Sequence, residues 1–382
     1  MTKLVVKILK LCKVFLKDIH LVISFYVCSI FKIKKNKVVF SSFSGSLYGR
    51  EPYEVSNKLL KETNNVDIVW IYDGQIDNKK IRVVKPNSGR AMYELRTANV
   101  WIDNCRKKFW IKKRKKQLYI QTWHGAVCIK AVEKDAEKTL PYWYIKSSMM
   151  DSNNADYIVA ECKWREENIY NSFWYNGPII RARFQYDLTN AAMRVRHTYG
   201  IKEEEKIILY VPTFRRDENL NCYISDFRSV VEYLEKYTGE KYKVIVRLHS
   251  VVAKRQEFFK QDMCIVNGTE YDSVDELIMS AEYVISDYSG CIFDAFRMGK
   301  KVVLFAKDLE TYVEEDRELY FDLKTFPSPI VDNESDLADK MAELNSNIEY
   351  ENKRKKFVEK LGYYKDDAGE IIAKQIRSYL NS

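Results

Sequence analysis

The chain has 382 residues, which is too long for one ordinary hydrophobic core and suits two domains of roughly 150 to 200 residues. Its composition is 46% hydrophobic and 31% charged, with 13 Gly and 7 Pro, and this excludes a disordered, collagenous or low-complexity chain. The net charge of +9 is uneven, because residues 1–190 carry 34 Lys and Arg against 18 Asp and Glu while the remainder is mildly acidic. We expect the basic half to meet an anionic partner. The eight cysteines contain no C-x-x-C pair, so neither a disulfide scaffold nor a zinc site is predicted.

Residues 1–37 predict a segment that associates with a membrane. Lysines recur every three or four residues from Lys3 to Lys17, opposite an apolar face that includes Leu4 and Ile8, and this is the period of an amphipathic helix. The apolar run 19–31 follows and is closed by lysines, but its roughly 13 residues fall short of the about 20 that cross a bilayer. We expect an interfacial helix on anionic lipid. The alternative is an N-terminal helix packed on the body of the protein with its lysines in solvent.

From Val38 onward, short apolar runs alternate with helical patterns. In the first half, strands are predicted at 38–42, 66–71, 100–103, 117–121 and 155–160, and helices at 53–61 and 90–96. After a polar, Gly-ended linker at 194–200, strands are predicted at 206–210, 243–249, 263–266, 283–286 and 301–305, and helices at 274–281 and 291–298. The alternation predicts two doubly wound α/β domains, 38–193 and 201–382, with the last helix a candidate to cross back to the first domain. Two such domains predict an active site in the cleft between them.

Two of the four histidines stand at the ends of predicted strands, His124 after residues 119–121 and His249 after residues 243–247. Ligands bind at the carboxyl ends of the strands in an open α/β sheet. An imidazole there can take a proton from a hydroxyl near neutral pH or, when protonated, donate to a phosphate oxygen. We therefore predict a functional role for both rings, with a structural hydrogen bond as the alternative for each. Arg215 and Arg247 also end strands and suit phosphate, with an exposed surface arginine as the alternative.

The segment 286–291 joins a predicted strand to a predicted helix and is rich in small residues. Backbone N–H groups can approach an anion closely there, and a helix N-terminus adds partial positive charge. Ser289 and Gly290 are therefore candidates for holding a diphosphate, and Asp294, one turn into the helix, is a candidate for ribose hydroxyls. The alternatives are N-capping by Ser289 or Asp287 and a first-turn acid at Asp294.

The run 106–116 is strongly basic with interleaved aromatic residues. Nucleic-acid binding would explain the charge, but no recognition motif accompanies it, so no nucleic-acid partner is predicted. The run indicates an anionic membrane surface or an anionic lipid-linked acceptor, with a solvated loop as the alternative. No P-loop, aspartate-rich metal motif or G-x-S-x-G elbow occurs, so neither ATP hydrolysis nor serine-hydrolase chemistry is indicated and no metal site is predicted.

Four motifs stand in order along the chain: Ile120-Gln121-Thr122-Trp123-His124-Gly125, Leu209-Tyr210-Val211-Pro212-Thr213-Phe214-Arg215, Arg247-Leu248-His249 and Ser286-Asp287-Tyr288-Ser289. Together with the stretches 97–104 and 320–330, they resemble the CDP-glycerol glycerophosphotransferases of teichoic acid synthesis over roughly residues 38 to 375. The chain departs from that pattern where it has 126–130 in place of Thr-Pro-Leu-Lys, Ser250 in place of Pro, Gly290 in place of Ser, and 182–187 in place of Gly-Tyr-Pro-Arg-Asn-Asp. These departures leave the polyol and the acceptor open.

The resemblance implies a GT-B fold, in which two Rossmann-like domains face a cleft. It implies a peripheral enzyme on the cytoplasmic face of the bacterial cell membrane, which moves a polyol phosphate, with glycerol phosphate preferred, from a CDP-polyol to a hydroxyl of a lipid-linked saccharide or polymer and releases CMP in teichoic acid or capsule synthesis. The chain is similar in length to the shorter members, which add one or a few units. No cofactor is expected, while assistance by a divalent cation and the oligomeric state are left open.

The same resemblance implies roles for individual residues. His124 is the general base on the acceptor hydroxyl, and Trp123 and Gly125 lie on the acceptor side. His249 is the second catalytic residue and, with Arg247 and Ser289, neutralises the donor diphosphate. The other implied donor-site residues are Thr213, Arg215, Ser286, Asp287, Gly290 and Asp294. Two alternative functions stay open: a GT-B glycosyltransferase that uses a nucleotide sugar, and a non-catalytic lipid- or polymer-binding protein with this fold.

Overall fold

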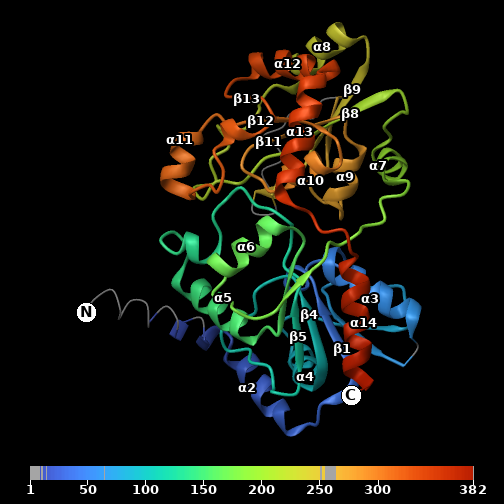
Figure 1. Ribbon diagram of the computed structural model, residues 1–382, viewed down its shortest axis with the longest axis vertical. Helices are drawn as coiled ribbons and strands as arrows, with labels where there is room; N and C mark the ends of the chain where they lie inside the picture. The colour runs from blue at the N-terminus through green and yellow to red at the C-terminus, as the bar shows by residue number, and fades with distance from the viewer. Residues whose placement is uncertain are drawn as a thin grey trace. The chain divides into compact units, whose positions relative to one another are not determined.

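The computed structural model describes residues 9, 12–13, 15–63, 65–249, 252–253 and 264–381. These residues form two compact units, each described here by itself. The first unit comprises the described residues up to Ala126, Val132–Tyr186 and the chain from Tyr363 onward, and the second comprises Val127–Ala131 and Asp187–Gly362. Each is an α/β unit with its own parallel sheet and helices around that sheet, as the alternating pattern predicts (Figure 1).

The sheet of the first unit has seven parallel strands in the order β3-β2-β1-β4-β5-β6-β7. Its strands are β1 (Lys34–Ser41), β2 (Asp67–Ile71), β3 (Ile81–Val84), β4 (Ala98–Asp103), β5 (Leu118–Gln121), β6 (Tyr157–Ala160) and β7 (Ile179–Arg181). The strand order reverses between β1 and β4, and in an open sheet the loops that leave such a pair of strands are where ligands bind. The loops after β1, β4 and β5 are therefore the part of this unit that matters for function.

Helices cover both faces of this sheet. They are α2 (Ile19–Val27), α3 (Arg50–Glu62), α4 (Gly89–Thr97), α5 (Tyr142–Asn154), α6 (Lys163–Ser172) and α14 (Ala368–Asn381). Because side chains alternate along a strand, Val38 and Phe40 of β1 pack in one core with α3 and α14, whereas Val39 packs in a second core with α2 and α4. The C-terminal helix α14, red in Figure 1, lies against α3.

The sheet of the second unit has six parallel strands in the order β10-β9-β8-β11-β12-β13. Its strands are β8 (Glu205–Val211), β9 (Lys241–Val246), β10 (Ile265–Asn267), β11 (Tyr283–Ser286), β12 (Lys301–Phe305) and β13 (Ile330–Val331). Its helices are α7 (Ala191–Tyr199), α8 (Phe227–Thr238), α9 (Val274–Ser280), α10 (Cys291–Arg297), α11 (Leu309–Thr311), α12 (Glu334–Glu343) and α13 (Ile348–Leu361). Here the order reverses between β8 and β11, which marks the loops after these two strands as the expected ligand site. Met263, which the prediction placed in a strand, lies outside the described residues.

The predicted linker at 194–200 is wrong, because residues 194–199 lie in helix α7 and Gly200 caps the end of that helix with φ +63°. The helix packs on α9, and Arg194 forms an ion pair of 2.7 Å with Glu276. Val195 is the only buried residue of the helix within 194–200, and most of that stretch is polar, so it resembles a linker in the sequence. Apart from Val127–Ala131, the second unit therefore begins at Asp187 rather than after the predicted linker, and the residues from Tyr363 return to the first unit.

The N-terminal segment differs in part from its prediction. In α2, Leu21, Val22 and Phe25 are buried in the core of the first unit, which is the packed alternative. The lysines at 34–37, predicted to close the membrane segment, begin strand β1 instead. Much of the earlier periodic stretch, including Lys3, lies outside the described residues. No helix in the described part of the chain is both long and apolar enough to cross a bilayer.

Lys37 is fully buried and holds β1 to helix α4. Its ammonium donates to Glu94 at 2.5 Å and to Thr97 at 2.7 Å. Burial alone would raise the pKa of the Glu94 carboxyl, but hydrogen bonds from Arg82 and Lys37 lower it to about 2. The pair is therefore ionised in the folded protein, with both charges away from water.

Replacing Lys37 with Ala should lower the free energy of unfolding of the first unit by about 3 kcal/mol, because a buried carboxylate loses a partner. Lys35→Ala is the matched control, since Lys35 lies on the same strand and is exposed. Urea unfolding followed by circular dichroism measures both variants. Equal unfolding midpoints for the two would contradict a stabilising role for the buried pair.

Candidate active site

The turn that carries His124 has an unusual backbone. Strand β5 ends at Gln121, and its side-chain oxygen accepts a hydrogen bond of 2.9 Å from the Trp123 N–H. Trp123 has φ +57° and Gly125 has φ +80°, so both lie in the left-handed region. This conformation costs about 1–3 kcal/mol for a residue other than glycine, and such strain concentrates at functional sites. The turn places the His124 ring at the end of the strand, as the prediction requires.

The hydrogen bond of the His124 ring determines which of its nitrogens can act as a base. Nδ1 lies 2.7 Å from the backbone oxygen of Asn104, which can only accept, so Nδ1 carries the proton. Nε2 then has a free lone pair, and it forms no hydrogen bond with the part of the chain that the structure describes. Burial lowers the pKa of the ring, although the Asn104 hydrogen bond and the charge of Glu51 oppose this. His124 is therefore neutral at pH 7, the state in which a general base works.

Buried groups hold Asn104 in place. Its amide nitrogen donates to Glu51 at 2.9 Å, and its amide oxygen accepts from the Phe43 N–H at 2.8 Å. Glu51 is fully buried and also accepts from the Tyr186 hydroxyl at 3.0 Å. These contacts join the loops after β1 and β4, the two strands at which the order reverses. The sequence analysis did not single out Glu51 or Phe43, because neither belongs to a recognised motif.

Two aromatic rings pack against the imidazole of His124. The Trp123 ring stacks on His124 at 4.7 Å between ring centres, and the Phe43 ring lies at 5.2 Å. Trp123 itself is buried and packs on Phe173, so it shapes the wall of the site more than it offers a surface to an acceptor. The backbone oxygen of Gly125 accepts from Arg165 at 3.4 Å.

In the second unit, Asp287 joins the loops that follow β8 and β11. Its carboxylate accepts from the Thr213 N–H at 2.8 Å and from Arg215 at 3.0 Å. The Ser286 hydroxyl donates to the Val211 carbonyl at 2.6 Å across the same two strands. Four of the predicted donor-site residues therefore lie together at the place where the strand order reverses. The Thr213 hydroxyl is buried without a hydrogen-bond partner in the described residues, so it has bonding capacity left for a ligand.

Arg215 is already held by two carboxylates. Besides Asp287, it donates to Asp308 at 2.6 and 2.9 Å, and only 4% of its surface is exposed. Burial disfavours the charged guanidinium, but the Asp308 hydrogen bonds and the nearby Asp287 charge raise its pKa above the usual value. These contacts favour a positioning role for Arg215 over direct binding of phosphate. The sequence analysis missed Asp308, although it follows strand β12 and the same strand-end reasoning would have found it.

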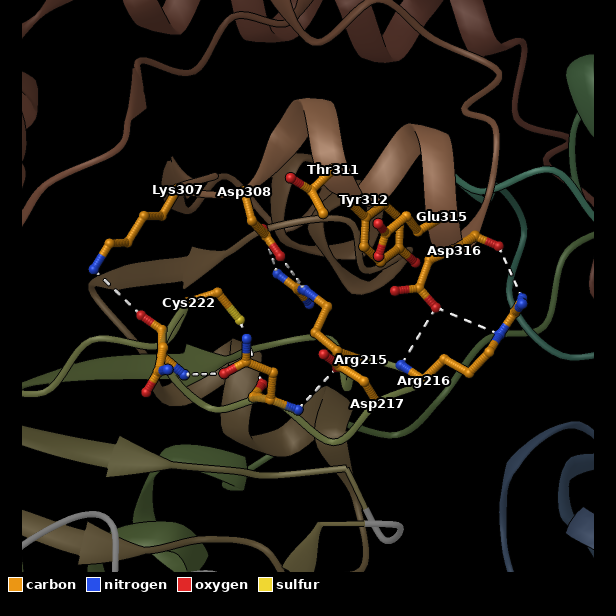
Figure 2. Close-up of a pocket in the computed structure, with 12 residues that line it drawn as sticks. Arg215, Arg216, Asp217, Cys222, Lys307, Asp308, Thr311, Tyr312, Glu315 and Asp316 are labelled. Atoms are coloured by element: carbon orange, nitrogen blue, oxygen red, sulfur yellow. Dashed lines mark hydrogen bonds and ion pairs between the residues drawn. The ribbon is translucent and has the colours of Figure 1, made fainter.

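A cavity of about 600 Å³ opens beside Arg215 (Figure 2). Its charged groups are largely paired: Arg215 points to Asp308, and Arg216 lies 3.8 Å from Asp316. The residues that line it come from the segments after β8 and β12: Arg215, Arg216, Asp217, Asn219, Asn221, Cys222, Lys307, Asp308, Thr311, Tyr312, Glu315 and Asp316. The cavity is therefore polar but carries little unpaired positive charge.

The other predicted donor-site residues also lie in the second unit. Arg247 donates to the carbonyls of Gly268 and Tyr271, and burial lowers its pKa. The His249 ring keeps contact with solvent and packs on Phe214 at 4.5 Å. The Ser289 hydroxyl accepts from the Cys291 N–H at 3.5 Å, and Asp294 forms an ion pair with Arg297 at 3.5 Å.

The two histidines therefore belong to different units, with Trp123, His124 and Gly125 in the first and the donor-site residues in the second. Their convergence on one substrate stays a prediction. Among the described residues, no cluster of three or more His, Cys, Asp or Glu side chains could hold a metal ion. The expectation that no cofactor is required also stays a prediction.

Two doubly wound α/β units with functional side chains at their strand ends define a GT-B protein. Solved structures show the same fold: the wall teichoic acid polymerase TagF, as a variant, aligns with a TM-score of 0.81 at 21% identity, covering 100% of this chain and 98% of that one. UDP-GlcNAc 2-epimerase from Neisseria meningitidis aligns with a TM-score of 0.53 at 12% identity, covering 90% and 100%. The chain belongs to the CDP-Glycerol:Poly(glycerophosphate) glycerophosphotransferase family, which it matches over residues 23–376.

Curated relatives of this chain are between 22% and 26% identical to it. The teichoic acid poly(glycerol phosphate) polymerase of Bacillus subtilis (strain 168) is 26% identical over 84% of this chain and 46% of its own length. The teichoic acid glycerol-phosphate transferase of Staphylococcus aureus (strain NCTC 8325 / PS 47) is 25% identical over 85% and 88%. The teichoic acid ribitol-phosphate polymerase TarL of the same strain is 23% identical over 94% and 65%. This chain spans about half the length of the poly(glycerol phosphate) polymerases from Bacillus subtilis and Staphylococcus epidermidis.

The protonation state of His124 can be measured without any substrate. Proton–nitrogen correlation spectra of the imidazoles at pH 7.5 should show a ring that is protonated on Nδ1 and bare on Nε2. Titration should give this ring a pKa below its ordinary value of about 6.5, because burial disfavours the charged form. His124→Ala removes the signal and so assigns it. A ring protonated on Nε2 would contradict the geometry of a base.

Proposed function

We propose that the protein transfers glycerol phosphate from CDP-glycerol to a hydroxyl of a lipid-linked saccharide or polymer and releases CMP. The observation that carries the proposal is the free Nε2 of a neutral His124, in a chain that belongs to this family. Glycerol phosphate is preferred because relatives with 22–26% identity are named for glycerol phosphate, although the ribitol-phosphate enzymes match nearly as well. Family membership and the relatives' names support teichoic acid or capsule synthesis as the setting.

In the proposed reaction, the acceptor oxygen attacks the phosphorus that carries the polyol. The hydroxyl proton passes to Nε2 of His124 as the new phosphorus–oxygen bond forms. The bond from that phosphorus to the bridging oxygen breaks, and CMP leaves with the electron pair. Phosphoryl transfer of this kind depends on positioning and charge neutralisation more than on covalent chemistry by the protein. His249 supplies part of that neutralisation at the donor phosphates.

The buried network of the second unit supports a donor site there. The Asp287 carboxylate holds the loops after β8 and β11 together and thereby places the unpartnered Thr213 hydroxyl. A ligand that accepts this hydroxyl's hydrogen bond would satisfy a group that is otherwise costly to bury. Phosphate oxygens meet that requirement.

A donor screen tests the proposal. CDP-glycerol, CDP-ribitol and UDP-sugars are each incubated with the protein and a lipid-linked saccharide acceptor, and release of CMP or UDP is followed. We expect CMP release with CDP-glycerol, and a loss of about 10²–10⁴-fold in His124→Ala because the general base is absent. His197→Ala is the matched control, since His197 is exposed on α7.

Other outcomes of the screen would identify a different function. CMP release that survives in His124→Ala would exclude His124 as the base. UDP release from a nucleotide sugar alone would favour a glycosyltransferase. No turnover of any donor would favour a protein that binds lipid or polymer without catalysis.

We also propose that the protein binds peripherally to the anionic cytoplasmic face of the membrane. Helix α2 buries one side, while Ile23 and Val27 on its other side are each 56% exposed and Ile30 beyond it is 76% exposed. The neighbouring basic run contributes exposed lysines, and its Arg114 donates to the carbonyl of Phe31 at 2.7 Å. An exposed apolar face beside lysines suits the interface of an anionic bilayer.

The aromatic residues of the basic run do not serve this surface as the sequence analysis expected. Trp110 is only 4% exposed and packs against Phe25 of α2. Lys108 forms an ion pair of 2.8 Å with Asp18. The exposed cations that remain for lipid are Lys112, Lys115 and Lys116.

The double substitution Ile23→Glu/Val27→Glu should reduce co-sedimentation with vesicles rich in anionic lipid by at least about tenfold, because two apolar contacts are lost and two negative charges are added. Met193→Glu is the control, since Met193 is 63% exposed on α7. Deletion of residues 1–37 is less informative, because it also removes the buried Lys37. Wild-type binding by the double variant would contradict this surface.

A further inference from the structure

The five residues Val127–Ala131 follow directly after the His124 turn but belong to the second unit. Two antiparallel backbone hydrogen bonds hold them there. The Ala131 N–H donates to the backbone carbonyl of Glu318 at 2.8 Å, and the Tyr320 N–H donates to the backbone carbonyl of Ile129 at 2.7 Å. Lys130 lies opposite Leu319 between these two bonds. The position of the Lys130 backbone within the second unit is therefore well defined.

The same segment lies on the loop after β11. A β-carbon at position 290 would lie 3.0 Å from the Val127 carbonyl oxygen and 3.6 Å from the Cys128 α-carbon. Glycine at position 290 permits this close approach, which a serine would crowd. Lys130 is thus carried on a segment that packs against the residues expected to meet the donor phosphates.

Lys130 is a half-buried residue that carries a cation. Its electrostatic neighbours are Asp287, which favours its charge, and Arg317 and Arg215, which oppose it. The oxygens of Asp287 are already used by the Thr213 N–H and by Arg215. Among the described residues, neither Lys130 nor Arg317 forms a side-chain hydrogen bond or ion pair. Burial lowers the pKa of Lys130 to about 8, which reflects the cost of keeping it charged.

The neighbouring cavity in Figure 2 is different in this respect. Arg215 and Arg216 face Asp308 and Asp316 there, so both arginines already have an anion. A ligand phosphate placed against them would have to displace a carboxylate. Lys130 requires no such exchange. Its positive charge also acts on the His249 ring: burial, and to a smaller extent repulsion by the Lys130 charge, lower the pKa of that ring. A phosphate anion between Lys130 and His249 would reverse this repulsion.

We propose that Lys130 binds the diphosphate of the CDP-polyol donor and stabilises the negative charge that develops on the bridging oxygen as CMP leaves. The inference rests on the proposed function and adds a residue to its donor site. Lys130 keeps its proton throughout: the phosphorus–oxygen bond breaks, the electron pair goes to the CMP oxygen, and the ammonium remains as the counter-charge.

The test compares Lys130→Met and Lys130→Arg with wild type in the full-length protein. Lys355→Met is the matched control, since Lys355 is exposed on α13 of the same unit. Calorimetry measures binding of CDP-glycerol and of inorganic pyrophosphate, and CMP release gives kcat and KM. Circular dichroism checks that each variant is folded.

We expect Lys130→Met to weaken binding of both CDP-glycerol and pyrophosphate at least tenfold and to lower kcat, because both the bound phosphates and the leaving group lose a charge. Lys130→Arg should retain most of the binding, and Lys355→Met should match wild type. The amine of Lys130 should also react with trinitrobenzenesulfonate faster than other lysines, and pyrophosphate should protect it.

Binding of both ligands by folded Lys130→Met with wild-type affinity would overturn the inference. If wild type releases no CMP from any CDP-polyol, the proposed function fails separately. In that case, loss of pyrophosphate binding in Lys130→Met would still support Lys130 as a phosphate ligand, and unchanged pyrophosphate binding would exclude it.

Discussion

The hydrogen bond between the His124 ring and the Asn104 carbonyl is the interaction on which the proposed chemistry depends. A backbone carbonyl can only accept, so this contact places the ring proton on Nδ1 and leaves Nε2 as the base. The contact in turn depends on the buried Glu51 carboxylate, which holds the Asn104 side chain. A buried polar network of this kind is stable only when its members are satisfied, and here its hydrogen bonds come from the loops after β1 and β4.

In the second unit, the balance of charge separates supporting residues from those that can meet a ligand. Arg215 lies between the Asp287 and Asp308 carboxylates, which match its charge and use its donors. Lys130 has no such partner among the described residues, although the residue is half-buried. A cation in water-poor surroundings is stabilised most by an anion that arrives with the substrate. The same physical rule thus gives Arg215 and Lys130 different roles.

Sequence reasoning was most successful where one local pattern determines the structure. The apolar runs that became β4, β5, β11 and β12 were predicted within one or two residues, because a strand buried on both faces must be apolar throughout. It failed for helix α7, which buries only two residues and whose polar stretch 194–200 resembles a linker. It also failed for Lys37, which belongs to a run of lysines but lies in the core. Burial of a single lysine depends on a partner 57 residues away, Glu94, and no local pattern contains that information.

The sequence by itself determined the α/β class, the strand ends that carry His124 and His249, and the membership of a family, because these follow from periodicity and from short ordered motifs. Only the tertiary structure decided which side chains are already satisfied. It paired Arg215 with Asp308, oriented His124 through Asn104, and brought Val127–Ala131 into the second unit. The reason is that pairing and desolvation depend on residues far apart in the chain, which become neighbours only when the strands take their order in the sheets.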